Sequence, residues 1–196
     1  DARFKRRVFP GETVDIEVEL IDTVSSVCVL RGKARVGNQL ALKTEFLLKI
    51  LNKITETFPE CSNISLYAGF NDLRRKSVED LKELRQAGLT LAYTGLESGD
   101  PVTLERIKKG LTPEQAEKGM AKAKAAGIDI LVSIIFGIGG KECSREHIVE
   151  TTRLLNMMKP EQIAPMALAV QPGTELANQI ETGEFIQATP LQILEE

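Results

Sequence analysis

The spacing of apolar residues changes near residue 45 and divides the chain into two patterns. Over residues 13–20 and 27–36 apolar and polar residues alternate, which predicts two half-buried strands. Gly37-Asn38 is a two-residue hairpin signal, and residues 39–44 return as a third strand. We therefore expect an antiparallel β-meander over residues 1–45. So small a sheet has one apolar face and needs a partner to bury it.

From Phe46 the apolar residues recur at helical spacing, and Pro59 ends that run. After it, apolar strands alternate with amphipathic helices, which predicts right-handed βαβ units and a parallel sheet. The strands are expected at residues 64–68, 89–94, 128–136 and 163–170. Four strands are too few to close an eight-stranded barrel. The predicted fold class is therefore α/β, with an incomplete parallel (β/α) barrel over residues 46–196 after the meander.

Helix-end signals support this division. Ser77 with Asp80 and Thr112 with Gln115 have the spacing of capping boxes at helix starts. Gly88 stands where a left-handed residue would end a helix. Ser144 is expected to cap the helix that follows the third barrel strand, and Pro160 follows its end.

Composition narrows the class of protein. The chain has 42% apolar and 27% charged residues and a net charge of −3, the balance of a globular protein without a basic field for nucleic acid. No apolar run is long enough to span a membrane, and the N-terminal residues do not resemble a signal peptide. We expect a cytoplasmic protein that binds a small molecule. No contact with nucleic acid or membrane is expected, and exposed strand edges are a route to self-association.

Cysteine and histidine offer few candidates for catalysis. Cys28, Cys61 and Cys143 are widely separated, so we expect neither a disulfide framework nor a metal site from them, and we assign no metal ligand. The only histidine is His147, which is interpreted as a solvated residue at a helix start because charged residues precede it. No catalytic residue is assigned.

The residues after each predicted strand form the strongest functional signal. In parallel α/β folds ligands lie at the carboxyl ends of the strands, where the loops converge. The four loops are rich in glycine or polar residues: 69–71, 95–100, 137–142 and 171–174. The carboxylate of Glu97 can accept hydrogen bonds from ribose hydroxyls or an ammonium group, and a planar ring can lie against the 137–142 backbone. Two simpler interpretations stay open: each glycine is only a turn, and Glu97 is a surface or helix-start charge.

Residues 64–185 resemble the later part of the radical S-adenosylmethionine (SAM) fold. The resemblance is carried by AGLTLAYTGLESGDPVTLERIKKGLTPEQ at 87–115, AKAAGIDILVSIIFGIGGKE at 123–142 and MALAVQPGTEL at 166–176. These strings are similar to the fourth, fifth and sixth strands of that barrel with the segments that follow them. Within the superfamily they look most like the broad group that includes oxygen-independent coproporphyrinogen oxidase-like and tRNA-modifying proteins, which fixes no substrate.

The resemblance implies SAM as a cofactor and assigns roles to individual residues. Glu97 and Ser98 match the loop near the ribose and amino group of SAM, and Ser133 points inward near that rim. The adenine side and the end of the sixth strand are matched by Gly137, Gly139, Gly140, Glu142, Gln171, Pro172 and Thr174.

The sequence departs from the family at the cluster. The family binds a [4Fe–4S] cluster through three closely spaced cysteines after its first strand, in a CxxxCxxC motif, because three thiolates hold three irons and leave the fourth for SAM. This sequence contains no such motif, so its residues offer no ligands for the cluster. We expect a radical SAM-type protein that keeps the SAM ribose and adenine loops and is inactive alone.

Residues 2–20, ARFKRRVFPGETVDIEVEL, are similar to the later part of hot-dog-fold beta-hydroxyacyl-ACP dehydratases. That similarity covers about 45 residues and excludes the segment that holds the catalytic histidine and carboxylate of those enzymes. A junction is therefore expected near residues 44–50. Two further interpretations follow, a chimeric or truncated polypeptide without catalytic function and a remnant of a dehydratase-like module.

Overall fold

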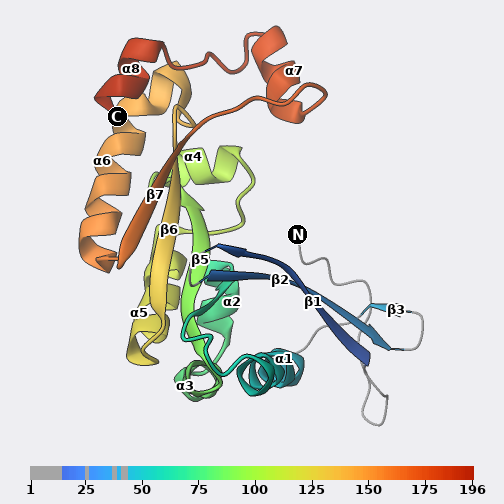
Figure 1. Cartoon of the computed structure of the whole chain (residues 1–196). Coiled ribbons are helices and arrows are strands. Elements are labelled where there is room, and N and C mark those ends of the chain that lie inside the picture. Colours follow the sequence, from blue (N-terminus) through green and yellow to red (C-terminus); the bar gives the residue numbers. More distant parts are fainter. Residues whose placement is uncertain (1–14, 25–26, 37–38, 41–43) are drawn as a thin grey trace. The chain divides into compact units, whose positions relative to one another are not determined.

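Figure 1 shows a computed structural model of the chain, which describes the backbone of residues 15–24, 27–36, 39–40 and 44–196. Side chains are described from Leu47 onward. The chain divides into two compact units. One comprises the residues up to Ile64 with Lys82–Thr90, and the other comprises Ser65–Leu81 with Leu91–Glu196. The domain boundary expected near residue 45 stays a prediction.

The first unit contains a small antiparallel sheet and a helix. The strands are β1 (Asp15–Val24), β2 (Val27–Val36) and β3 (Gln39–Leu40), paired in that order, and α1 (Thr44–Thr57) follows. Residues 13–14 and 41–43 of the expected strands lie outside the described residues. That these strands are a fragment of a hot-dog fold stays a prediction.

The second sheet is the parallel one, which agrees with an α/β fold and a partial barrel. Its strands are β4 (Ile64–Tyr67), β5 (Leu89–Glu97), β6 (Asp129–Phe136) and β7 (Gln162–Ala167), and they lie side by side in this order. The registers of β5 with β6 and of β6 with β7 are parallel. β5 continues three residues beyond its expected end, so that Glu97 becomes its last residue.

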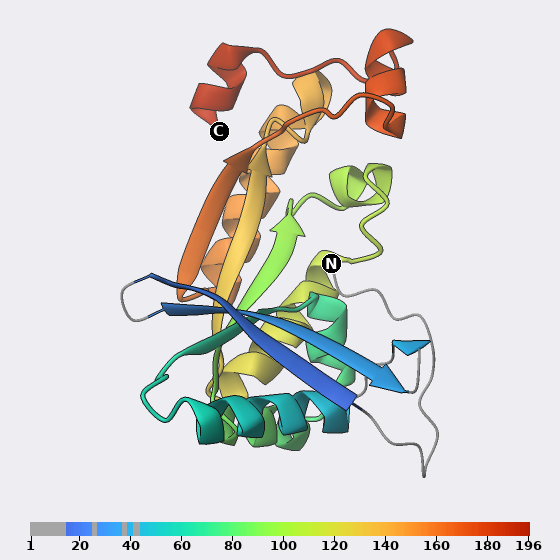
Figure 2. The ribbon, with the colours of Figure 1, turned by 45° about the vertical axis from the view of Figure 1, so that its right-hand side comes forward.

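The helices connect these strands and cover one face of the sheet. Figures 1 and 2 show α5 and α6 running along β5, β6 and β7, with α7 and α8 beyond the carboxyl ends of β6 and β7. The helices after β4 are α2 (Phe70–Arg75), α3 (Val78–Gln86), α4 (Pro101–Arg106), α5 (Pro113–Ala125), α6 (Gly140–Met158), α7 (Glu175–Glu181) and α8 (Pro190–Glu195).

Alternation along the strands decides which residues form the core. Ala92 and Leu96 of β5 and Val132 of β6 are fully buried together with Met120 of α5 and Leu154 of α6. Each fully buried aliphatic side chain of this size stabilises the fold by about 1.5–3 kcal/mol. The residues between them, which point to the other face, are only half-buried. That less covered face carries the polar groups described below.

The predicted helix ends are largely confirmed. The backbone amide of Asp80 donates to Ser77 Oγ at 2.9 Å, and Thr112 caps α5 with Gln115 completing the capping box. Gly88 has a φ of 109°, as expected for a helix-ending glycine. The start predicted for α6 is wrong, because the helix begins at Gly140 and Ser144 lies within its second turn. Gly140, which the sequence predicts in a loop, is therefore the first residue of the helix.

Candidate functional site

Glu97 ends β5 and turns its side chain toward the less covered face of the sheet. The pairing of β5 with β6 shifts register between Gly95 and Glu97, and Glu97 has a φ of 67°. Its Oε1 accepts a hydrogen bond from Lys109 Nζ at 2.7 Å, and its Oε2 accepts one from Ser133 Oγ at 3.3 Å. The side chains of Lys109 and Glu97 are 27% and 16% exposed, so this ion pair is partly shielded from water.

Gly95 makes room for this ion pair. A Cβ atom at Gly95 would lie 2.2 Å from Glu97 Oε1 and 2.9 Å from Lys109 Nζ. Any larger residue there would displace the carboxylate, the ammonium group or both. The glycine before Glu97 thus positions two charged groups next to each other at the end of β5.

Ser98 points away from Glu97 and is completely buried. Its Oγ lies 2.8 Å from His147 Nδ1 and accepts a hydrogen bond from the backbone amide of Asp100 at 3.0 Å. The structure therefore brings Glu97 and Ser133 together, and it gives the Ser98 hydroxyl partners within the protein. A direct contact of Ser98 with a ligand stays a prediction.

The glycine loop after β6 is closely packed by its own chain. A Cβ atom at Gly139 would lie 2.8 Å from the Cys143 carbonyl oxygen, and one at Gly140 would lie 2.8 Å from the Ile186 carbonyl oxygen. Gly137 and Gly140 also have positive φ values, 79° and 64°. Gly139 and Gly140 therefore allow the chain to approach itself closely, and the contact of a bound ring with this loop stays a prediction.

The remaining predicted residues lie at the surface. Glu142 is exposed on the first turn of α6, and Gln171 and Pro172 are exposed after β7. Thr174 caps α7, with its Oγ1 accepting a hydrogen bond from the Ala177 amide at 3.2 Å. The structure describes no contact that joins these four residues to Glu97 or Ser133.

Sequence reasoning missed a short segment, residues 106–110, which comprises the last residue of α4 and the start of the connection to α5. It contacts residues at or beyond the ends of all four strands. Gly110 O accepts from Asn71 Nδ2 at 2.7 Å, in α2 after β4, and Lys109 pairs with Glu97 at the end of β5. The other two contacts come from Arg106, which donates to the carbonyl oxygens of Ile138 and Gly139 at 2.9 and 2.8 Å, and from Lys108, which lies 2.7 Å from Glu175 Oε1. The sequence shows one arginine, two lysines and a glycine here, with no signal of this role.

His147 corrects another interpretation. It was expected to be solvated at a helix start, but it is 1% exposed and lies in the second turn of α6. Burial lowers the pKa of His147 below its usual value, while the nearby carboxylates of Glu196 and Asp100 act in the opposite direction. The imidazole is therefore a buried, neutral group at neutral pH.

The described residues contain no group of three or more histidine, cysteine or acidic side chains that would hold a metal ion. Cys61 and Cys143 are both free thiols. Within this same described part, no helix is long and apolar enough to cross a bilayer.

Comparisons with known proteins indicate the family and the fold. The family model described as the radical SAM superfamily matches residues 10–155. A heme chaperone of Bacillus subtilis is 25% identical over 151 residues, which are 76% of this chain and 39% of that protein. An uncharacterized methyltransferase of Pyrococcus horikoshii is 30% identical over 95 residues, 48% of this chain and 20% of that protein. The chain thus spans well under half the length of these relatives.

Solved structures show the same fold. Coproporphyrinogen III oxidase of Escherichia coli superimposes with a TM-score of 0.62 at 16% identity, covering 79% of this chain and 36% of that one. Methylornithine synthase gives a TM-score of 0.53 at 18% identity, covering 66% of this chain and 35% of that one.

A separate similarity is to a 3-hydroxyacyl-[acyl-carrier-protein] dehydratase of Pelotomaculum thermopropionicum, 43% identical over 49 residues, 25% of this chain and 35% of that protein.

Proposed function

The chain belongs to the radical SAM superfamily, and from this premise we propose that its second unit contributes the ribose and amino-acid side of a SAM-binding site. The observation that carries the proposal is the contact of Glu97, at the end of β5, with both Lys109 and Ser133 of β6. Carboxyl ends of parallel strands are where such folds bind ligands.

The chemistry of this pair suits SAM. The ligand carries ribose hydroxyls and an ammonium group, for which the Glu97 carboxylate is an acceptor, and a carboxylate, for which the Lys109 ammonium is a donor. Ser133 adds a hydroxyl beside Glu97. The Glu97 carboxylate and the Lys109 ammonium neutralise each other in the free protein. They offer one partner each for the ammonium and the carboxylate of SAM. Contacts of the adenine with the 137–142 loop and residues 171–174 remain part of this proposal.

The cluster of the family does not fit the residues of this chain. A [4Fe–4S] cluster supplies the electron for SAM cleavage and takes cysteine thiolates as ligands. The sequence has three cysteines, at 28, 61 and 143, and no two of them share a short motif. We propose that this chain by itself binds SAM without cleaving it.

Calorimetric titration with SAM tests the binding site. We expect Glu97→Gln and Lys109→Met to weaken binding about tenfold, or about 1.4 kcal/mol, because each leaves one charge of the ligand unpaired. Lys53→Met is the matched control, since Lys53 forms an exposed pair with Glu56 on α1 of the first unit, and it should bind like the wild type. Equal affinities for all four proteins would remove Glu97 and Lys109 from the site.

A second candidate is a chimeric polypeptide without catalytic function, which the dehydratase similarity over about 50 residues favours. It predicts a break in the reading frame near codons 40–50 of the genomic DNA. A continuous gene across that region would contradict it. A working dehydratase is disfavoured because the chain's sole histidine lies in α6 of the second unit.

A further inference from the structure

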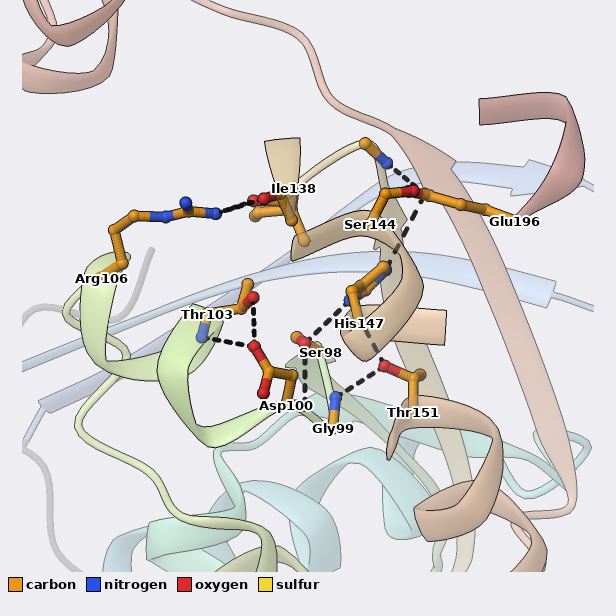
Figure 3. A network of polar contacts seen from close by, with 12 residues as sticks. Ser98, Gly99, Asp100, Thr103, Arg106, Ile138, Ser144, His147, Thr151 and Glu196 are labelled. Atoms are coloured by element: carbon orange, nitrogen blue, oxygen red, sulfur yellow. Dashed lines mark hydrogen bonds and ion pairs between the residues drawn. The ribbon is translucent and has the colours of Figure 1, made fainter. Parts of the chain in front are cut away.

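We propose that His147 is a positioning residue that holds residues 98–100 against α6 and thereby fixes the direction of Glu97. The proposal deepens the proposed function and rests on it, because Glu97 is the residue assigned to SAM. Figure 3 shows His147 and Thr151 of α6 beside Ser98, Gly99 and Asp100. No described hydrogen bond or ion pair joins His147 to Glu97, so its effect on Glu97 would be transmitted through Ser98.

Three hydrogen bonds fix the backbone directly after Glu97. Ser98 Oγ lies 2.8 Å from His147 Nδ1, the Gly99 amide donates to Thr151 Oγ1 at 2.8 Å, and the Asp100 amide donates to Ser98 Oγ at 3.0 Å. Gly99 fits this place because a Cβ atom there would lie 2.5 Å from the Glu150 carbonyl oxygen. The loop is therefore pressed against α6 at the level of its backbone.

The contacts of His147 point to one tautomer. The Ser98 hydroxyl accepts from the Asp100 amide and has one proton to donate, and the Thr151 hydroxyl lies 3.4 Å from the same Nδ1. When Ser98 donates to Nδ1, Nδ1 is an acceptor and the ring proton resides on Nε2, 4.0 Å from Glu196 Oε2. This neutral tautomer is part of the proposal.

The hydrogen bonds that hold residues 98–100 against α6 form an anchor, and this anchor directly follows Glu97 in the chain. A φ of 67° is unusual for a residue with a long side chain, so it persists only where the surroundings enforce it. On its N-terminal side, Glu97 is held by the pairing of β5 with β6. On its C-terminal side, the first group held by another element is the Ser98 hydroxyl, which is hydrogen-bonded to His147 of α6. Releasing Ser98 would let Glu97 relax and turn its carboxylate away from Lys109.

The other ring nitrogen faces the glycine loop. His147 Nε2 lies 4.0 Å from Glu196 Oε2, and both side chains are almost fully buried. Glu196 accepts hydrogen bonds from the Gly137 amide and from Ser144 Oγ. One imidazole thus stands between the loop after β5 and the carboxylate that holds the loop after β6, as Figure 3 shows. Among described residues, the charged groups that act on this ring are Glu196 and Asp100.

SAM titrations of five variants test the proposal. We expect His147→Leu and Ser98→Ala each to weaken SAM binding about tenfold, and their double variant to weaken it no further, because both break one contact. His147→Asn returns an acceptor near Nδ1 and should recover part of the affinity. Met158→Ala is the control for lost stability, since Met158 is buried at the far end of α6. It should lower Tm and leave the affinity unchanged.

Two results would overturn the proposal. One is that the losses of affinity in the two single variants add up in the double variant. The other is that Met158→Ala loses as much affinity as His147→Leu for the same decrease in Tm. His147 would then be an ordinary core residue.

Two ligand-free measurements separate this proposal from the SAM site. If wild type binds no SAM, the proposed function fails, but hydrogen exchange still reports on the anchor. The Gly99 and Asp100 amides should exchange faster in His147→Leu than in Met158→Ala, and equal rates would refute the anchor. Nitrogen-15 NMR of the single imidazole should show an unprotonated Nδ1, and a protonated Nδ1 would contradict the hydrogen bonds proposed for Ser98.

Discussion

At the scale of single residues, the end of β5 separates two neighbouring side chains into different environments. Glu97 shares a half-buried surface with Lys109 and Ser133, whereas Ser98 lies in a buried network with His147. Glu97 ends β5 with a left-handed φ of 67°, and the chain turns there so that the two side chains have different surroundings. The charged group therefore stays accessible to a ligand while the residue after it holds the loop in place.

The buried imidazole makes stability depend on pH. The unfolded chain takes up a proton at the usual histidine pKa of about 6.5, whereas burial lowers the pKa of His147 in the folded protein. The unfolded state therefore binds more protons as pH falls below about 6.5, and stability declines until pH has passed the folded-state pKa. We expect urea denaturation to show a smaller free energy of unfolding at about pH 5.5 than at about pH 7.5.

His147→Leu is the control for this pH effect, because His147 is the chain's sole histidine. The variant should be less sensitive to pH over the same range. Parallel pH profiles for the two proteins would show that His147 does not become more basic on unfolding.

These residues also show what the sequence can predict. Glu97 was identifiable because it follows an apolar strand between two glycines. Lys109 was not, since its contact with Glu97 depends on how the chain turns after α4. His147 was misinterpreted because the charged residues beside it lie on the other side of α6, and the start of that helix had been placed too late. Local sequence could not reveal a partner 49 positions away.

At the scale of elements, the periods of apolar residues and the helix-end signals were sufficient for the parallel sheet and its helices. The capping boxes at Ser77 and Thr112 form as predicted because they depend on residues three positions apart. The extension of β5 to Glu97 was not predictable from apolar alternation, because the strand continues through Gly95 and into a register shift. Pairing with β6 decides where β5 ends.

Arg106 is expected to hold α4 against the glycine loop. It donates two hydrogen bonds to the Ile138 and Gly139 carbonyl oxygens, and its guanidinium lies 4.8 Å from the centre of the Phe185 ring. Arg106→Met removes both charge-assisted hydrogen bonds from these part-buried carbonyl groups, and with them the cation–π contact. We expect a loss of about 2–3 kcal/mol in the free energy of unfolding, measured by urea denaturation.

Arg153→Met is the matched control for Arg106→Met. Arg153 forms a half-exposed pair with Glu150 one turn away on α6, and such pairs contribute less than about 1 kcal/mol. Similar losses in the two variants would mean that Arg106 contributes no more than a surface arginine.

At the scale of the whole molecule, the strand-end loops of the second unit are held by one short segment as well as by the sheet. Residues 106–110 contact residues at or beyond the ends of β4, β5, β6 and β7, and the first unit contributes none of these contacts. A partial barrel lacks the neighbouring strands that close the full barrel, so its rim needs another constraint. These contacts supply that constraint, and the proposed SAM site is therefore expected to persist in a chain with four parallel strands.

Unlike the proposed SAM site, the iron–sulfur cluster of the family is not expected to form in this chain. Three thiolates must converge on a cluster, but Cys61 and Cys143 lie in different units, and the sequence offers Cys28 as the remaining cysteine. After anaerobic reconstitution with iron and sulfide we expect no stoichiometric cluster and no 5′-deoxyadenosine from SAM, measured by iron analysis and chromatography. A Cys61→Ser/Cys143→Ser variant should retain as little iron as the wild type. A full cluster in the wild type that disappears in this variant would show that distant cysteines converge, and SAM cleavage would then have to be attributed to this chain.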